Sequence, residues 1–224
     1  MVVCTPHLMA SRAVEAPYNK HLQILGALRD AAPAGLDLRL GWEIMLDMPG
    51  TDLRHPQLAL GGSKAVLVEF PRMLVPPHAT EELFRLKMSG IVPVLAHPER
   101  YSGCTVEQVE AWRRSGTVIQ VDGAGLLGGH RSAGLARALL EEGLIDVIAS
   151  DTHGDARSLA PVRDWLLEVG TGEQAELLTH ENARRLLADE PLEPAPPLVV
   201  RHGMMAQLRR LLLGRTRSGG AAPS

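Results

Sequence analysis

The sequence predicts an α/β fold in which short parallel strands close into a barrel. Six apolar runs rich in Val, Ile and Leu alternate with stretches of helical periodicity, and this order implies a parallel sheet. The runs are mostly continuous, as in strands that are buried on both faces. Residues of metal-ligand type lie at five of the runs, and barrel strands deliver their carboxyl ends to one mouth. An open sheet would gather its site mainly at one switch point, so this distribution favours closure.

The strands and helices are expected within residues 1–189, which we predict to form one domain. The predicted strands are 2–5, 37–44, 65–70, 92–97, 117–122 and 146–150. The predicted helices are 17–31, 80–88, 105–116, 132–142, 159–169, 173–179 and 181–188. The clearest helix end is Gly143, because glycine readily adopts the left-handed conformation that terminates a helix.

The composition changes after Asp189. Four prolines between residues 190 and 197 predict an extended linker over 190–202. Residues 203–224 combine leucines and methionines with arginines and end in small residues, which predicts a basic amphipathic helix followed by disorder. Such a helix either makes a weak contact with a membrane surface or packs on its own domain or a neighbouring subunit.

The overall composition excludes several classes of protein. The net charge is −3 and only 3% of the residues are aromatic, which argues against a nucleic-acid partner. Two cysteines do not make a disulfide framework and suggest free thiols in a reducing compartment. No apolar run approaches about 20 residues and no signal peptide is visible, so we expect a cytoplasmic protein.

Six imidazole and carboxylate side chains make up the candidate metal site. They are His7, Glu43, Glu69, His97, Asp151 and His153. Singly, each has a structural explanation, such as a histidine that caps a loop, but an acid at the end of a buried strand is costly unless it is paired. Together they indicate one shared site. Imidazole and carboxylate without thiolate suit Zn²⁺, Mn²⁺ or Fe, and three carboxylates favour more than one cation.

Three other chemistries lack their motifs. The chain has no Gly-x-Ser-x-Gly elbow for serine hydrolysis and no phosphate-binding loop of the Gly-x-x-x-x-Gly-Lys type. The Cys-x5-Arg loop of thiol-dependent tyrosine phosphatases fails at both cysteines. Ala10 and Glu110 stand where Cys4 and Cys104 would need an arginine.

With these residues in place, the chain resembles the bacterial tyrosine phosphatases of the capsular-polysaccharide type, in the polymerase and histidinol phosphatase (PHP) superfamily. The resemblance spans about residues 1–188. The matching motifs are Cys4-Thr5-Pro6-His7, Tyr18-Asn19, Gly41-Trp42-Glu43, Leu67-Val68-Glu69-Phe70-Pro71, Ala96-His97-Pro98-Glu99-Arg100, Gln120-Val121 to Leu127-Gly128, Ala149-Ser150-Asp151-Thr152-His153 and Glu181-Asn182.

The resemblance implies a distorted TIM-like (βα)7 PHP barrel with up to three divalent cations, usually Mn²⁺ and otherwise Fe²⁺ or Zn²⁺. It implies hydrolysis of phosphotyrosine on the bacterial tyrosine autokinases that regulate exopolysaccharide assembly. Carried over by match, the six residues above would be metal ligands. Arg100 would contact the phosphate, and Arg157 would be a second phosphate contact.

The chain departs from the family pattern at its start. The family opens with a strand that carries His-x-His, whereas this chain begins in the Thr-Pro-His strand, so we expect a barrel without its first strand and helix. A barrel that lacks a strand exposes two edges and is expected to form homo-oligomers. Two other readings stay open: a catalytically impaired PHP-fold binding protein, and a small-molecule phosphatase of the histidinol phosphate type.

Overall fold

The computed structural model describes residues 1–128 and 131–198. The predicted basic helix at 203–224, with its proposed membrane contact, lies outside these residues and stays a prediction. No helix within the described part of the chain is long and apolar enough to cross a bilayer.

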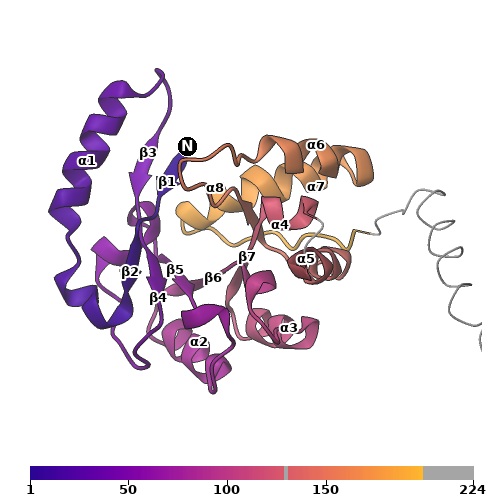
Figure 1. Ribbon diagram of the computed structural model, residues 1–224, viewed down its shortest axis with the longest axis horizontal. Helices are drawn as coiled ribbons and strands as arrows, with labels where there is room; N and C mark the ends of the chain where they lie inside the picture. The colour runs from indigo at the N-terminus through magenta and orange to yellow at the C-terminus, as the bar shows by residue number, and fades with distance from the viewer. Residues whose placement is uncertain (129–130, 199–224) are drawn as a thin grey trace, which may run out of the picture.

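Within residues 1–128 and 131–198, eight parallel strands form two sheets (Figure 1). The strands are β1 (Val2–Cys4), β2 (His7–Met9), β3 (Leu38–Leu40), β4 (Glu43–Met45), β5 (Ala65–Glu69), β6 (Val92–Ala96), β7 (Val118–Asp122) and β8 (Val147–Ala149). The large sheet has the order β2-β4-β5-β6-β7-β8, and β1 pairs with β3 in a separate ladder. This is the predicted α/β class with a parallel sheet.

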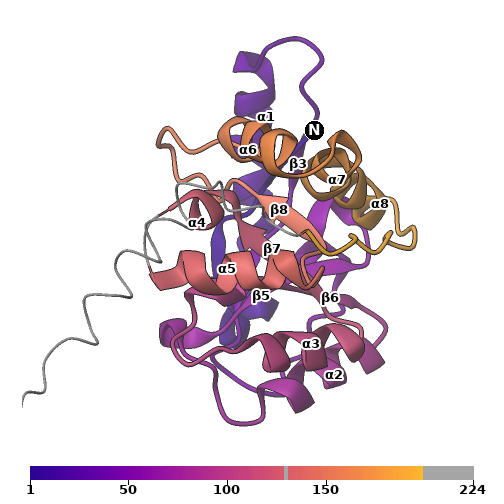
Figure 2. The same cartoon turned by 90° about the vertical axis from the view of Figure 1, so that its right-hand side faces the viewer.

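The helices follow the strands, as predicted. They are α1 (Tyr18–Ala31), α2 (Ala79–Met88), α3 (Val106–Arg114), α4 (Gly123–Leu127), α5 (Arg131–Glu141), α6 (Ala160–Val169), α7 (Gly172–Glu176) and α8 (Asn182–Leu187). A π-helical turn (Leu177–Glu181) joins α7 to α8. Figures 1 and 2 place α2 beside α3 and α6 beside α7, while α1 and β3 stand out on one side of the molecule.

Local sequence explains several of these boundaries. Thr105 and Gln108 form a capping box, in which each side chain accepts the other's backbone N–H at the start of α3, and this satisfies donors that a helix start leaves free. Gly143 has φ of 67° just beyond α5. Its predicted role as the end of that helix is confirmed.

The strands differ from the prediction at two places. The predicted strand 2–5 matches β1, but a further strand that was not predicted, β2, begins at His7, while 37–44 divides into β3 and β4 at Gly41. Gly41 packs so tightly that an added Cβ would lie 2.7 Å from the Cδ2 atom of Leu60. His7 and Glu43 therefore begin strands instead of ending them, and they face each other as paired residues of β2 and β4.

The sheet curls without closing through hydrogen bonds. Within residues 1–128 and 131–198, β2 and β8 pair on one side only. Their ends nevertheless approach, because the Nε2 atoms of His7 in β2 and His153 after β8 lie 3.3 Å apart. The two edges of the sheet are thus brought together, as the prediction of one shared mouth requires, by a contact between side chains and not by backbone hydrogen bonds.

Both faces of the strands are buried, which explains the continuous apolar runs. In β5, Val66 and Val68 belong to the larger apolar cluster, whereas Ala65 and Leu67 belong to a smaller one that also includes Leu186 of α8. Because the strand side chains are used for the apolar core, polar side chains that could bind a ligand are found beside the ends of the strands.

The segment predicted as a proline-rich linker packs on the domain over residues 190–198. Ala195 and Leu198 are buried, and the side chain of Asn182 donates to the backbone oxygen of Glu193 at 2.9 Å. Prolines do keep the segment extended, but its apolar side chains and backbone groups find partners on the domain. Residues 190–198 therefore form a strap, by which we mean an extended segment that packs along the domain, and they are not a free linker.

Candidate metal centre

Four of the predicted ligands meet where the carboxyl ends of β5 and β6 lie level with the first residues of β2 and β4. The Nε2 atom of His97 donates to Oε1 of Glu43 at 2.8 Å and lies 3.8 Å from Oε2 of Glu69. The Nδ1 atom of His7 lies 3.5 Å from Oε2 of Glu43 and 3.7 Å from Oε1 of Glu69. One donor atom each from His7, Glu43 and Glu69 fits within 4.8 Å.

The electrostatics of this cluster suit a cation. Burial, and then the charge of Glu43, raise the pKa of Glu69. Burial opposes protonation of His97, but the hydrogen bond to Glu43 and its charge outweigh burial and raise the pKa of His97. The Nδ1 atom of His97 is buried and has no hydrogen-bond partner among the described residues. Two crowded carboxylates with imidazole nitrogens are a donor set that fits divalent cations of borderline softness.

The backbone turns sharply where ligand-type residues leave two of the strands. His97 has φ of 36° and Asp151 has φ of 44°, a left-handed region that costs on the order of 1–3 kcal/mol for a residue with a side chain. Such strain persists where the surroundings enforce it, and it is frequent at functional sites. Here it turns the chain at the point where each side chain enters the cluster.

The remaining predicted site residues adjoin the cluster and interact with one another. Asp151 lies 2.6 Å from Nη2 of Arg100 and 3.5 Å from Nη1 of Arg157. The Nη2 atom of Arg157 lies 3.1 Å from Nδ1 of His153, and His153 in turn approaches His7. The structure therefore brings all eight predicted site residues into one continuous network.

Sequence reasoning missed two acidic members of this network. Oδ2 of Asp122, the last residue of β7, lies 2.5 Å from Nη2 of Arg100. Oε1 of Glu99 accepts the backbone N–H of Asp122 at 3.0 Å, and burial, opposed by that hydrogen bond, raises the pKa of Glu99 to about 7. A signal for Asp122 was present, since it ends the strand predicted over 117–122 as Glu69 ends the run 65–68.

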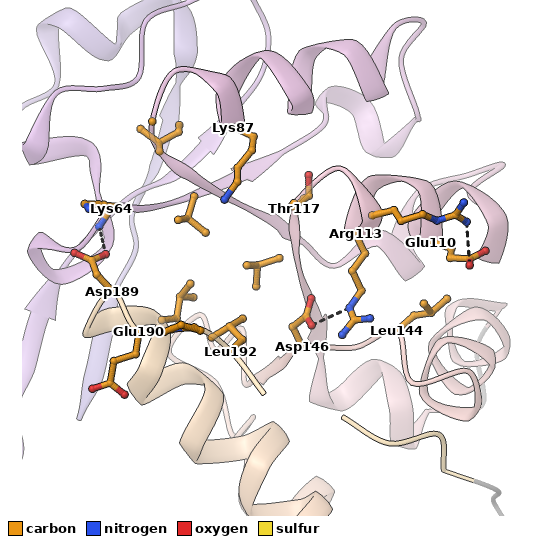
Figure 3. A pocket seen from close by; sticks show the side chains of 18 residues that line it. Lys64, Lys87, Glu110, Arg113, Thr117, Leu144, Asp146, Asp189, Glu190 and Leu192 are labelled. Atoms are coloured by element: carbon orange, nitrogen blue, oxygen red, sulfur yellow. Dashed lines mark hydrogen bonds and ion pairs between the residues drawn. The ribbon is translucent and has the colours of Figure 1, made fainter. Parts of the chain in front are cut away.

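A cavity of about 840 Å³ lies at the opposite, amino-terminal end of the sheet (Figure 3). Lys87 reaches into it, and Arg113 lies beside Asp146. Lys87 and Arg113 belong to the last turns of α2 and α3, where cations complement the partial negative charge of a helix end. The helix ends thus explain the positive charges around this cavity. The cluster of carboxylates and imidazoles lies at the opposite end of the sheet.

Comparisons with known proteins show which proteins this chain is similar to. A family profile described as "Capsular polysaccharide synthesis, CpsB/CapC" matches residues 1–188. The chain is 28% identical over 173 residues to the tyrosine-protein phosphatase YwqE of Bacillus subtilis, covering 75% of this chain and 66% of that protein. It is 25% identical over 160 residues to the putative tyrosine-protein phosphatase CapC of Staphylococcus aureus, covering 68% and 63%.

A solved structure supports the same relationship. It comes from work on YwqE of Bacillus subtilis and CpsB of Streptococcus pneumoniae, described as unique metal-dependent tyrosine phosphatases. It superimposes with a TM-score of 0.64 at 28% identity, over 82% of this chain and 75% of the other. The chain spans just under two thirds of the length of the two named relatives.

Proposed function

Because the chain belongs to the CpsB/CapC family of capsular polysaccharide synthesis proteins, we propose that it is a metal-dependent protein-tyrosine phosphatase. The observation that carries the proposal is the convergence of His7, Glu43, Glu69 and His97 at one end of the sheet. The names of two relatives and of a similar solved structure, all tyrosine phosphatases, support it.

The proposed metal ligands are the six predicted residues. Mn²⁺, or another divalent cation such as Fe²⁺ or Zn²⁺, is the proposed cofactor, with up to three ions in a complete site. Bound cations would supply charge neutralisation at the phosphoryl group and activation of the attacking water. The ligands are His7, Glu43, Glu69, His97, Asp151 and His153.

Two guanidinium groups are proposed to bind the phosphoryl oxygens. Arg100 and Arg157 both lie against Asp151 at the edge of the cluster, and guanidinium groups donate to phosphate in a planar, charge-assisted way. A tyrosyl leaving group has a pKa of about 10, so it departs with little help from an acid. The arginines therefore contribute orientation and charge, and no cysteine nucleophile is required.

The proposed substrate is phosphotyrosine on a bacterial tyrosine autokinase that regulates exopolysaccharide or capsule assembly. Cytoplasmic action is part of this proposal, since Cys4 and Cys104 are free thiols. A homo-oligomer is also proposed. Within the described chain, β2 and β8 each have an unpaired edge, and such edges favour association.

The test is hydrolysis of a phosphotyrosine peptide by the Mn²⁺-loaded chain, compared with histidinol phosphate. We expect hydrolysis of the peptide, a loss of at least about a thousandfold on chelation, and recovery when Mn²⁺ is restored. Thiol alkylation should leave the rate unchanged. Activity that survives chelation but not alkylation would overturn the proposal. Preference for histidinol phosphate, or peptide binding without turnover, would replace it with the small-molecule or binding-protein reading.

A further inference from the structure

We propose that Asp122 is a positioning residue that holds Arg100 in the orientation in which it receives a phosphoryl group. This inference rests on the proposed function for its purpose, but the contact on which it depends belongs to the chain itself. Asp122 was not among the predicted site residues, and its position between a strand end and a helix start suggests the role.

Asp122 is fixed in place at three points. Its backbone N–H donates to Glu99 at 3.0 Å. Its Oδ1 atom accepts the backbone N–H of Ala124 at 2.9 Å and so caps α4. Its Oδ2 atom is left for Arg100, at 2.5 Å. A residue held by one hydrogen bond at its backbone N–H and another at its carboxylate is a rigid anchor, and Asp122 is only 5% exposed.

Arg100 uses one nitrogen for both of its acidic partners. Nη2 lies 2.5 Å from Asp122 and 2.6 Å from Asp151. Among residues 1–128 and 131–198, the contacts of Arg100 with its two acids are made through Nη2, and its Nε and Nη1 atoms donate no hydrogen bond. The guanidinium is thus held from one side, and the donors on its other atoms are available to an anion.

Asp151 cannot serve as the sole anchor. It is shared between Arg100 and Arg157 and is itself a proposed metal ligand, so cations would compete for its charge. A guanidinium next to bound cations is also repelled by them, because like charges at short range interact strongly in a partly buried site. Asp122 is a second, dedicated negative charge that offsets this repulsion.

The chain contains a matched control at the other end of the sheet. Asp146 is also 5% exposed. Its Oδ1 atom accepts from Nε of Arg113 at 2.9 Å, and its Oδ2 atom accepts the backbone N–H of Ile119 at 2.9 Å. Asp122→Asn and Asp146→Asn therefore make the same chemical change in the same kind of environment, one next to the cluster and one remote from it.

The first measurement is steady-state kinetics of the Mn²⁺-loaded chain. In Asp122→Asn we expect KM for a phosphotyrosine peptide and Ki for inorganic phosphate to rise about tenfold, because a charge-assisted hydrogen bond becomes a neutral one. Metal content should be unchanged, and Asp146→Asn should keep both constants. In an Arg100→Ala background, Asp122→Asn should have no further effect, as for residues that act through one another. Equal kinetics of the two asparagine variants would overturn the inference.

The second measurement is independent of turnover. A guanidinium clamped by carboxylates rotates slowly, so the Nη resonances of Arg100 should be resolved in ¹⁵N NMR spectra, with Arg100→Lys supplying the assignment. They should collapse in Asp122→Asn and persist in Asp146→Asn. Persistence in Asp122→Asn would overturn the inference even if the chain is active. Absence of hydrolysis by the wild type would overturn the proposed function while the resonances still decide the role of Asp122.

Discussion

At the amino-terminal end of the sheet Arg113 pairs with Asp146, whereas at the carboxyl-terminal end Arg100 lies between Asp122 and Asp151. The two ends use the same side-chain types. At the amino-terminal end Arg113 and Asp146 form a pair of their own, whereas at the carboxyl-terminal end Arg100 contacts two acids and shares one of them, Asp151, with Arg157. Shared and crowded charges leave capacity for a ligand, while matched pairs leave none.

The backbone differs between the two ends in the same way. The tight turns after α2, α3 and α5 at the amino-terminal end use Gly90, Gly116 and Gly143, all with positive φ, which glycine adopts without steric cost. At the carboxyl-terminal end His97 and Asp151 adopt positive φ despite their side chains. At His97 and Asp151 the left-handed backbone thus coincides with a ligand-type side chain.

The largest effect is expected from a change in the crowded cluster. Glu69→Gln should lower kcat/KM at least about a hundredfold, since even outer partners of metal ligands are worth 10- to 100-fold. The metal-free variant should melt at a higher temperature than the wild type. Burial and Glu43 raise the pKa of Glu69, so its charge is unfavourable without a cation.

Glu110→Gln is the control for Glu69→Gln, because Glu110 forms a surface pair with Arg114 near the remote cavity. It should leave both kcat/KM and the melting temperature nearly unchanged. A metal-free Glu69→Gln protein that melts below the wild type would contradict the description of a crowded site.

A core change at the amino-terminal end should have an intermediate effect, on stability alone. Ile145 is fully buried two residues before β8, and Ile145→Ala should lower the free energy of unfolding by about 2–4 kcal/mol because a cavity remains. Urea unfolding measures this loss. The value of kcat/KM per folded molecule should stay at the wild-type level, and a specific loss of activity would show that the two ends are coupled.

The smallest effect concerns pH. Burial raises the pKa of Asp146 above its ordinary 3.8, and Arg113 offsets only part of this. The folded protein therefore binds this proton more tightly than the unfolded chain does. Relative to Asp146→Asn, the wild type should lose stability as the pH rises from 3.8 through the raised pKa.

Urea unfolding of the wild type and Asp146→Asn across this range gives the difference in unfolding free energy. That difference should shift against the wild type with rising pH. A shift in its favour would mean that Arg113 more than compensates for burial, and that the pair at the amino-terminal end is a stabilising one at neutral pH.

Much of the fold was predictable because the relevant signals are local. Apolar runs identified the large-sheet strands from β4 to β8 but not β2, and Gly143 marked the end of α5. The break at Gly41 was missed, since it depends on contact with Leu60, which the pattern of residues 37–44 does not contain. The strap over 190–198 was missed for the same reason, because its partners, such as Asn182, lie elsewhere in the chain.

By itself the sequence determined which residue types stand near the ends of the strands, because the length of a strand and the polar residues that flank it follow from neighbouring positions in the chain. Tertiary structure alone decided which of them share partners. His97 meets Glu43, and Arg100 meets Asp122, only because parallel strands bring their ends together. Asp122 and Glu69 both end a predicted strand, so the sequence alone does not distinguish them. The contact of Asp122 with the guanidinium of Arg100, which no local pattern encodes, shows that Asp122 anchors an arginine, whereas Glu69 is a proposed metal ligand.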